Sequence, residues 1–361
     1  MRRRDLFAGI GALSVMPSTT WADANNPTFL SAARHSDGSY HLCGLDERGT
    51  VLFNLPIPDR GHAAAAHPER PEAVAFARRP GRFAMIVDCA RGREVAILSP
   101  PVDRHFYGHG VFSSDGSILF TTENDLETLD GRIGLWDATQ GYSRIGDIPS
   151  GGIGPHDIGR LPGSETLVVA NGGIATHPDS GRTPLNLATM RSNLTYLDAD
   201  QGPRDVVELD PVFRQNSIRH LSIRDDGLVA AGMQWNGPEF EYPPLVITHA
   251  LGAEADLLEA PSDIQRRMQG YVGSIAFVHG SDLVGATSPR GGLVHLFDAQ
   301  TGEFHSHFHA VDVCGIATAP SGTAMVTTGT GVVGQLVGAE LASPQTTEWM
   351  WDNHLVVVQA I

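Results

Sequence analysis

The sequence has few cysteines and no long apolar run, and both scarcities exclude classes of protein. The three cysteines, Cys43, Cys89 and Cys314, form no CxxC or haem-attachment pattern. An odd number of cysteines leaves at least one thiol unpaired in an exported chain. No stretch of 18 or more apolar residues occurs, so the sequence predicts no membrane-spanning segment in the mature protein.

Basic residues are also scarce. The chain has 25 Lys and Arg against 41 Asp and Glu, which gives a formal charge of −16. Phosphates would be repelled and no basic patch stands out, so nucleic acid is excluded as a partner and cationic ligands are favoured. The sequence also has no GxSxG, HExxH or phosphate-binding glycine loop, so it does not indicate the enzyme classes built on them.

The first 24 residues are predicted to be an export signal that does not belong to the fold. Arg2-Arg3-Arg4 precedes Leu6-Phe7, a short apolar run reaches Met16, and Ala22-Asp23-Ala24 has the small-x-small pattern of a cleavage site. This arrangement resembles a twin-arginine signal, and a general export signal is the alternative. We therefore expect a periplasmic protein with a single domain over residues 25–361.

One short motif recurs along the chain, in which a histidine opens an apolar strand. Its copies begin at His62, His109, His156, His220 and His354, and two further copies begin at Ser274 and Cys314. The successive spacings are 47, 47, 64, 54, 40 and 40 residues. The many glycines and prolines, 41 and 23, favour short strands joined by tight turns. Strand-rich repeats of this length are typical of propeller blades.

The repeats predict an all-β fold, a seven-bladed β-propeller with four-stranded blades. Only a short tail, residues 354–361, follows the last copy of the motif, whereas residues 28–34, 40–46 and 50–58 supply three strands before the first. We therefore expect the last blade to combine strands from both termini. Such closure removes the exposed sheet edges that an open array would leave.

If each copy opens the innermost strand of its blade, the first residues meet at one mouth of the central channel. The metal-ligand candidates are His62, His109, His156, His220, His354 and Cys314. Imidazole and thiolate bind iron, copper and zinc, and we expect iron or copper, with zinc as the alternative. A single channel histidine is more often a water-bridged polar residue, but five histidines and one cysteine at seven equivalent positions favour a metal centre.

Further residues on the same face are expected to line a pocket. They are His177 in the long insertion over residues 172–193, Tyr107, Asp157, Arg219, Arg290, Asp312 and Asp352. The carboxylates adjoin ring members and could orient imidazoles, and Arg290 could hold an anionic group. Another histidine cluster, His305-x-His307-x-His309, lies on a predicted outer strand and is equally well explained as a solvated edge.

The chain resembles a family of uncharacterised exported propellers, domain of unknown function 1513. The resemblance covers essentially the whole mature chain. It rests on Arg60-Gly61-His62, His105-Phe106-Tyr107-Gly108-His109-Gly110, Gly151-Gly152-Ile153-Gly154-Pro155-His156, Ala170-Asn171-Gly172-Gly173, Ser217-Ile218-Arg219-His220, Asp312-Val313-Cys314-Gly315 and Trp351-Asp352-Asn353-His354.

Members of that family are typically encoded beside imelysin-type periplasmic iron-uptake proteins and a di-haem oxidoreductase. The resemblance therefore implies a part in iron acquisition, with imelysin-type proteins as expected partners, but it supplies no catalytic residues. In architecture alone the chain is also similar to nitrous oxide reductase. It lacks that enzyme's cysteine-rich copper domain, so the same reaction is not implied.

Three hypotheses follow. The first is a periplasmic metal-binding propeller that handles iron or copper, with a redox-active centre as one version. The second is a metal-dependent enzyme that holds a small organic substrate on the irregular loops of the same face. The third is a protein-docking propeller whose histidines only fill the channel. The sequence does not decide whether the protein is an enzyme.

Overall fold

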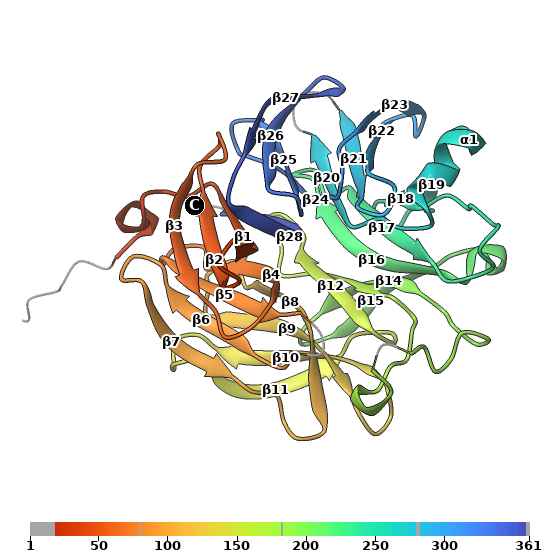
Figure 1. Ribbon diagram of the computed structural model, residues 1–361. Helices are drawn as coiled ribbons and strands as arrows, with labels where there is room; N and C mark the ends of the chain where they lie inside the picture. Colours follow the sequence, from red (N-terminus) through yellow and green to blue (C-terminus); the bar gives the residue numbers. More distant parts are fainter. Residues whose placement is uncertain (1–18, 79–80, 182, 279–281, 359–361) are drawn as a thin grey trace, which may run out of the picture.

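Seven antiparallel sheets of four strands each surround one axis (Figure 1). The structure is a computed structural model that describes residues 19–78, 81–181, 183–278 and 282–358. The prediction of an all-β, seven-bladed propeller with four-stranded blades is confirmed.

The innermost strands of blades one to seven contact the innermost strands of the neighbouring blades around the axis. In blade order they are β4 (Gly61–Ala66), β8 (Arg104–Phe112), β12 (Pro155–Arg160), β16 (Asn216–Ile223), β20 (Ser274–Val278), β24 (Val313–Thr318) and β28 (Trp349–Val357). Each contains one copy of the recurring motif, so the equivalence inferred from the spacing is confirmed.

The other strands lie outward in each blade. The second strands are β5 (Glu72–Ala77), β9 (Ile118–Asp125), β13 (Leu167–Asn171), β17 (Val229–Trp235), β21 (Leu283–Ser288), β25 (Ala324–Thr328) and β1 (Phe29–His35). The third are β6 (Ala84–Asp88), β10 (Gly131–Asp137), β14 (Asn193–Asp198), β18 (Val246–His249), β22 (Leu293–Asp298), β26 (Val332–Val337) and β2 (Tyr40–Leu45). The outermost are β7 (Arg93–Leu98), β11 (Ser143–Pro149), β15 (Gly202–Glu208), β19 (Asp256–Leu258), β23 (Phe304–His309), β27 (Glu340–Thr346) and β3 (Val51–Pro56).

The described helices are short and lie outside the sheets. They are η1 (Trp21–Ala24), η2 (Pro178–Ser180), η3 (Pro211–Phe213), α1 (Ser262–Gln265) and η4 (Arg266–Met268). The last two form a short helical insertion in the connection before β20. None of the helices in the described part of the chain has the length and apolar character needed to traverse a bilayer.

Blade seven closes the ring with strands from both ends of the chain. Strand β28 pairs antiparallel with β1, and Phe29 lies opposite Val357. The sheet then continues outward through β2 and β3, so its order is β28-β1-β2-β3. In Figure 1 the last strand lies beside the first strands of the chain. The predicted closure by both termini is confirmed, and it pairs an edge that would otherwise be open.

The hydrophobic core lies between neighbouring blades. For example, Phe76 and Ile86 of blade one pack with Leu119 and Trp136 of blade two in one buried cluster. Sheets covered on both faces bury side chains of both strand faces, which explains the nearly continuous apolar sequence of strands such as β6 and β13. The packed blades form a rigid frame for the residues around the axis.

Most of the expected export signal, residues 1–18, lies outside the described residues. The remainder includes η1, in which the indole of Trp21 is buried. Its Nε1 donates a hydrogen bond to the carbonyl oxygen of His67 at 2.9 Å. The described end of that segment thus packs against blade one.

Candidate metal centre

The innermost strands bulge at, or next to, the histidines that reach the axis. In β12, for example, the register moves from Pro155↔Asn171 to Asp157↔Ala170, which leaves His156 as an extra residue. Similar register shifts skip the histidines of β4, β8 and β28 and the cysteine of β24. In β16 the extra residue is Arg219, and His220 beside it lies opposite Gly232. The exception is β20, whose residue at this position is Ser274. A bulge turns a side chain away from the regular alternation, here toward the axis.

Five imidazole rings lie together inside the propeller. His62, His109, His156, His220 and His354 are between 2% and 8% exposed. Adjacent ring centroids are 4.6 Å apart for His62 and His354, and 4.8 Å apart for His156 and His220. The widest recorded pair, His109 and His220, is separated by 6.4 Å. We call these five residues the histidine cluster.

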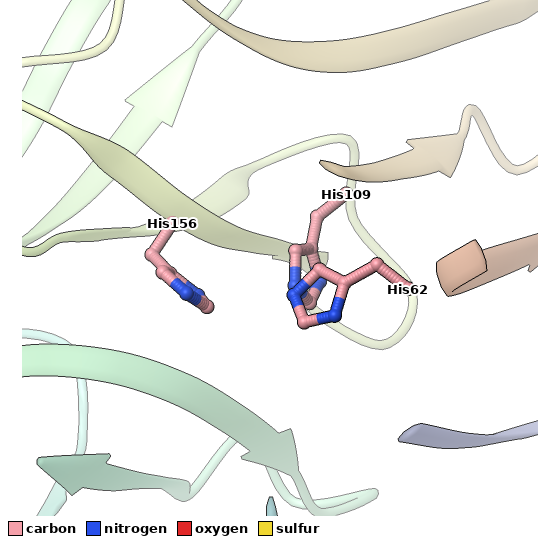
Figure 2. Close-up of side chains that lie close together, drawn as sticks. All are labelled: His62, His109 and His156. Atoms are coloured by element: carbon pink, nitrogen blue, oxygen red, sulfur yellow. The ribbon is translucent and has the colours of Figure 1, made fainter. Parts of the chain in front are cut away.

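Two groups within the cluster have the spacing of metal ligands. Ligand atoms of His62, His109 and His156 lie within 4.8 Å of one another, and so do those of His109, His220 and His354. Figure 2 shows the first group, in which three side chains from three different strands lie close together. His109 belongs to both groups. The geometry therefore allows a metal ion in the cluster.

Neighbouring acceptors orient some of the rings. The Nδ1 of His109 lies 2.9 Å from Oδ1 of Asp157, and the Nδ1 of His156 lies 3.1 Å from the carbonyl oxygen of Arg219. Carboxylate and carbonyl oxygens only accept, so both Nδ1 atoms carry the proton and both Nε2 atoms keep a free lone pair. An oxygen that holds the second nitrogen of an imidazole is the usual support of a metal-binding histidine.

Several other ring nitrogens of the cluster are buried with no hydrogen-bond partner among the described residues. They are Nδ1 of His62, Nε2 of His109, both nitrogens of His220, and Nε2 of His354. A buried polar atom without a partner costs free energy, so this many in one place requires a ligand or ordered water. The residues present therefore fit a metal ion.

Burial lowers the pKa values of histidines in the cluster and so favours the neutral rings that can bind a cation. It lowers the pKa of His62 to about 4 and lowers the pKa values of His156, His220 and His354 well below the usual value. Repulsion between neighbouring imidazoles acts in the same direction. These four rings are therefore neutral at pH 7, the form in which imidazole binds metals.

Cys314 and Ser274 are not members of the two triads. In the described part of the chain, no group with metal-ligand spacing contains Cys314. Its thiol donates to the carbonyl oxygen of Asp312 at 3.1 Å, and burial, followed by the charges of Asp312 and Asp352, raises its pKa to about 12. Ser274 is buried and lines the channel.

The other predicted pocket residues fall at different places. Asp157 contacts the cluster directly, and the backbone of Arg219 does so through its carbonyl. Tyr107 is buried and its hydroxyl lies 3.3 Å from Oγ1 of Thr176 in the long insertion. His177 is partly exposed beside Asp179. These last two line neither of the cavities described next.

Two cavities flank the cluster. The central channel, of about 770 Å³, is lined by all seven innermost strands and by His109, His220 and His354. A second cavity, of about 510 Å³, lies where the innermost strands begin, and we call it the mouth cavity. It contains Arg290, Asp312, Cys314 and Asp352. Four of the sequence-predicted residues thus meet in one cavity.

Sequence reasoning missed the arginines that surround Asp352. Arg60 Nε lies 2.7 Å from its Oδ2, and Arg78 contacts its Oδ1 at 2.5 Å. The Nδ1 of His62 is 3.6 Å from the same carboxylate. Arg60 lies two positions before the first motif histidine, and this proximity could have indicated that Arg60 is near the channel mouth. The partner of Arg60 is near the other end of the chain, and only the closed ring brings them together.

The chain is similar to one described family and to propellers of known structure. A family described as "Protein of unknown function (DUF1513)" matches residues 55–358. No curated protein matches the chain significantly. Hydrazine synthase of Kuenenia stuttgartiensis shares 13% identity at a TM-score of 0.63, over 91% of this chain and 100% of the other. The WD40 repeats of RRP9 share 13% identity at a TM-score of 0.56, over 84% and 88%. At these identities the similarity concerns the fold alone.

Proposed function

The chain belongs to the DUF1513 family of proteins of unknown function, and we propose that its histidine cluster binds a transition metal ion. The observation that carries this proposal is the set of buried ring nitrogens that have no hydrogen-bond partner among the described residues. A structural histidine would be expected to satisfy both nitrogens. Neutral imidazoles with free lone pairs would instead be satisfied by one cation.

One ion per chain is expected. Both triads need His109. Its Nδ1 is bonded to Asp157, so only Nε2 is free, and one nitrogen lone pair binds one ion. The two triads would therefore be two parts of a single coordination sphere, not two separate sites.

We propose iron or copper as the metal and periplasmic iron acquisition as the process. An all-imidazole donor set suits copper, iron and zinc. The family resemblance supports iron handling, and the arginine-rich start of the sequence supports export. A metal held by neutral imidazoles can change oxidation state, which would give the site a redox role.

A metal-dependent enzyme is the second candidate, and the central channel favours it. The channel gives access to three of the five histidines and has the volume of a small-molecule site. A bound metal would supply a Lewis acid there. A docking propeller without metal is the third, and nothing specific in the described residues favours it.

Metal analysis of the purified protein, prepared without a histidine tag, tests the proposal. We expect about one transition metal ion per chain after loading with copper or ferrous iron under competition with zinc. The double variant His109→Ala/His156→Ala should lose the ion, because it removes a ligand from each triad. A protein that stays metal-free under every loading condition would contradict the proposal and favour the docking alternative.

The variant Asp157→Asn provides a milder test that leaves all five imidazoles in place. Its amide is nearly isosteric, but it loses the charge that holds the proton on Nδ1 of His109. Loss of such a partner typically lowers metal affinity by about 10- to 100-fold. Asp179→Asn is the matched control, because the side chain of Asp179 is exposed beside His177, whereas the cluster is buried. Equal metal affinity in both variants would show that Asp157 does not position a ligand.

A further inference from the structure

We propose that the mouth cavity is a binding site for a small oxyanion with two or more negative charges, a polycarboxylate or a phosphate compound. The site is distinct from the histidine cluster, and the proposal does not depend on metal binding. It rests on the charge, the partners and the shape of the residues that form the cavity.

The mouth cavity has a positive charge in an acidic protein. Four arginines line it, Arg34, Arg60, Arg78 and Arg290, against two carboxylates, Asp312 and Asp352. The formal balance is therefore +2, whereas the whole chain carries −16. A concave site of one sign concentrates the field and attracts ligands of the opposite sign.

Asp352 is already neutralised within the cavity. It is 5% exposed and is paired with both Arg60 and Arg78, at 2.7 and 2.5 Å. One carboxylate between two guanidinium groups leaves a surplus positive charge beside it. The two guanidinium groups are therefore already held in place where an anionic ligand could bind.

Arg34 and Arg290 form no ion pair with any acidic residue in the described ranges. The guanidinium of Arg290 instead stacks over the ring of Tyr271, with Cζ 4.3 Å from the ring centroid. Stacking fixes the plane of the group and leaves its edge donors for a ligand. A planar fork of donors matches the two oxygens of a carboxylate or phosphate.

The cavity is also suited to a small organic ligand. Its volume of about 510 Å³ lies within the range of small-molecule sites, and Tyr40 and Trp351 add aromatic walls. Of the two carboxylates in the cavity, Asp352 is paired with arginines. Asp312 has no ion pair with an arginine in the described residues, so it is the one group that would repel an anion. Two positive groups without acidic partners, placed on blades five and seven, favour a ligand with at least two negative charges.

Titration calorimetry on the metal-free, full-length exported chain would test this site. The probes are citrate, inorganic phosphate and the singly charged acetate, in a low-salt buffer. We expect one citrate or phosphate to bind per chain, acetate to bind at least tenfold more weakly, and affinity to fall as salt is raised. Tighter binding of citrate would assign the site to polycarboxylates, and tighter binding of phosphate to phosphate compounds.

The variant Arg34→Gln/Arg290→Gln should weaken binding by about tenfold or more, because each removed guanidinium contributes charge-assisted hydrogen bonds. The matched control is Arg48→Gln/Arg214→Gln, which removes the same charge from exposed arginines outside the cavity. All four arginines are exposed, so both double variants should fold. If the Arg34→Gln/Arg290→Gln protein does not fold, the single variant Arg290→Gln provides the same test. Failure of both dianions to bind the wild-type protein, or equal weakening in the control, would overturn the proposal. The use of metal-free protein separates this outcome from that of the metal experiment.

Discussion

Buried histidines serve two different purposes in this propeller. His249 is satisfied on both sides, by the hydroxyl of Tyr196 at 2.8 Å and by the carbonyl oxygen of Ala253 at 3.0 Å. His220 is equally buried, yet neither of its nitrogens has a hydrogen bond within the described residues. The sequence separates the two by position, since His249 lies on an outer strand and His220 opens a repeat. The contrast in hydrogen bonding supports a structural role for the first and a ligand role for the second.

His67 is a structural histidine whose charge state should control stability at acid pH. Its Nδ1 accepts hydrogen bonds from the backbone nitrogens of Glu69 and Arg70 at 3.1 and 2.9 Å. Burial, reinforced by the nearby charge of Arg70, lowers its pKa to about 4. The native state therefore binds fewer protons than the unfolded chain between pH 6.5 and 4. Stability is complete above that window and is lost as the pH falls through it.

The variant His67→Asn should flatten this pH dependence. The asparagine oxygen can accept the same two backbone hydrogen bonds but cannot be protonated in this range. Urea unfolding between pH 7 and 4 should show a slope lower by up to about 1.4 kcal/mol per pH unit, the effect of one proton. Some stability will be lost at every pH because the imidazole also packs against Phe112. An unchanged slope would show that another group titrates in this window.

At the scale of the element, the regular features of the strands could be predicted and the irregular ones could not. Alternating apolar residues and Gly turns indicated four strands per blade because each strand must cover a neighbouring sheet. The bulges at the motif positions were not predicted, and β8 begins at Arg104, five residues before His109. A bulge depends on how many residues the paired strand offers, which the sequence of one strand does not contain.

Strand β9 contains a buried charge. Acidic residues are mostly exposed, yet Glu123 is fully buried within the strand. Its carboxylate forms a two-pronged pair with Arg144 of β11, at 2.8 and 2.9 Å. The strand between them, β10, allows this contact because it has Gly134 there, where a Cβ would collide with the carboxylate. A buried ion pair thus links β9 to β11 across β10.

Removing one partner of this pair should destabilise the blade. Arg144→Met leaves a buried carboxylate without its counter-charge, which typically costs about 3–5 kcal/mol of unfolding free energy. The double variant Glu123→Leu/Arg144→Met should recover part of the loss, because no charge is then left unpaired. Arg93→Met is the matched control, since Arg93 is 67% exposed and its loss should change little. Urea unfolding measures all three, and an Arg144→Met protein as stable as the control would contradict a role for this pair.

At the scale of the whole molecule, the sequence predicted the ring and most of what meets at its centre. Equivalent positions in a closed ring must converge, so a repeat period was sufficient to bring five distant histidines together. The mouth cavity was only partly predicted. It depends on contacts such as that between Arg60 and Asp352, whose partners belong to neighbouring blades at opposite ends of the chain. No periodicity encodes such a pair, because each residue occurs once.

The closure of blade seven makes a last prediction possible, which concerns the stability of the entire ring. Arg34 of β1 lies opposite Met350 of β28 on one side and opposite Tyr40 of β2 on the other. Directly opposed residues in antiparallel strands have the spacing that a disulfide requires.

A bond from position 34 to 350 would link the two ends of the chain, whereas a bond from 34 to 40 would close only one hairpin. Because the unfolded chain loses more freedom when a longer loop is closed, Arg34→Cys/Met350→Cys should stabilise the oxidised protein more than Arg34→Cys/Tyr40→Cys, by about 3 kcal/mol. Thermal unfolding with and without a reductant measures the difference, since reduction should bring the two variants to similar midpoints. Equal stabilisation by the two bonds would contradict this loop-length argument.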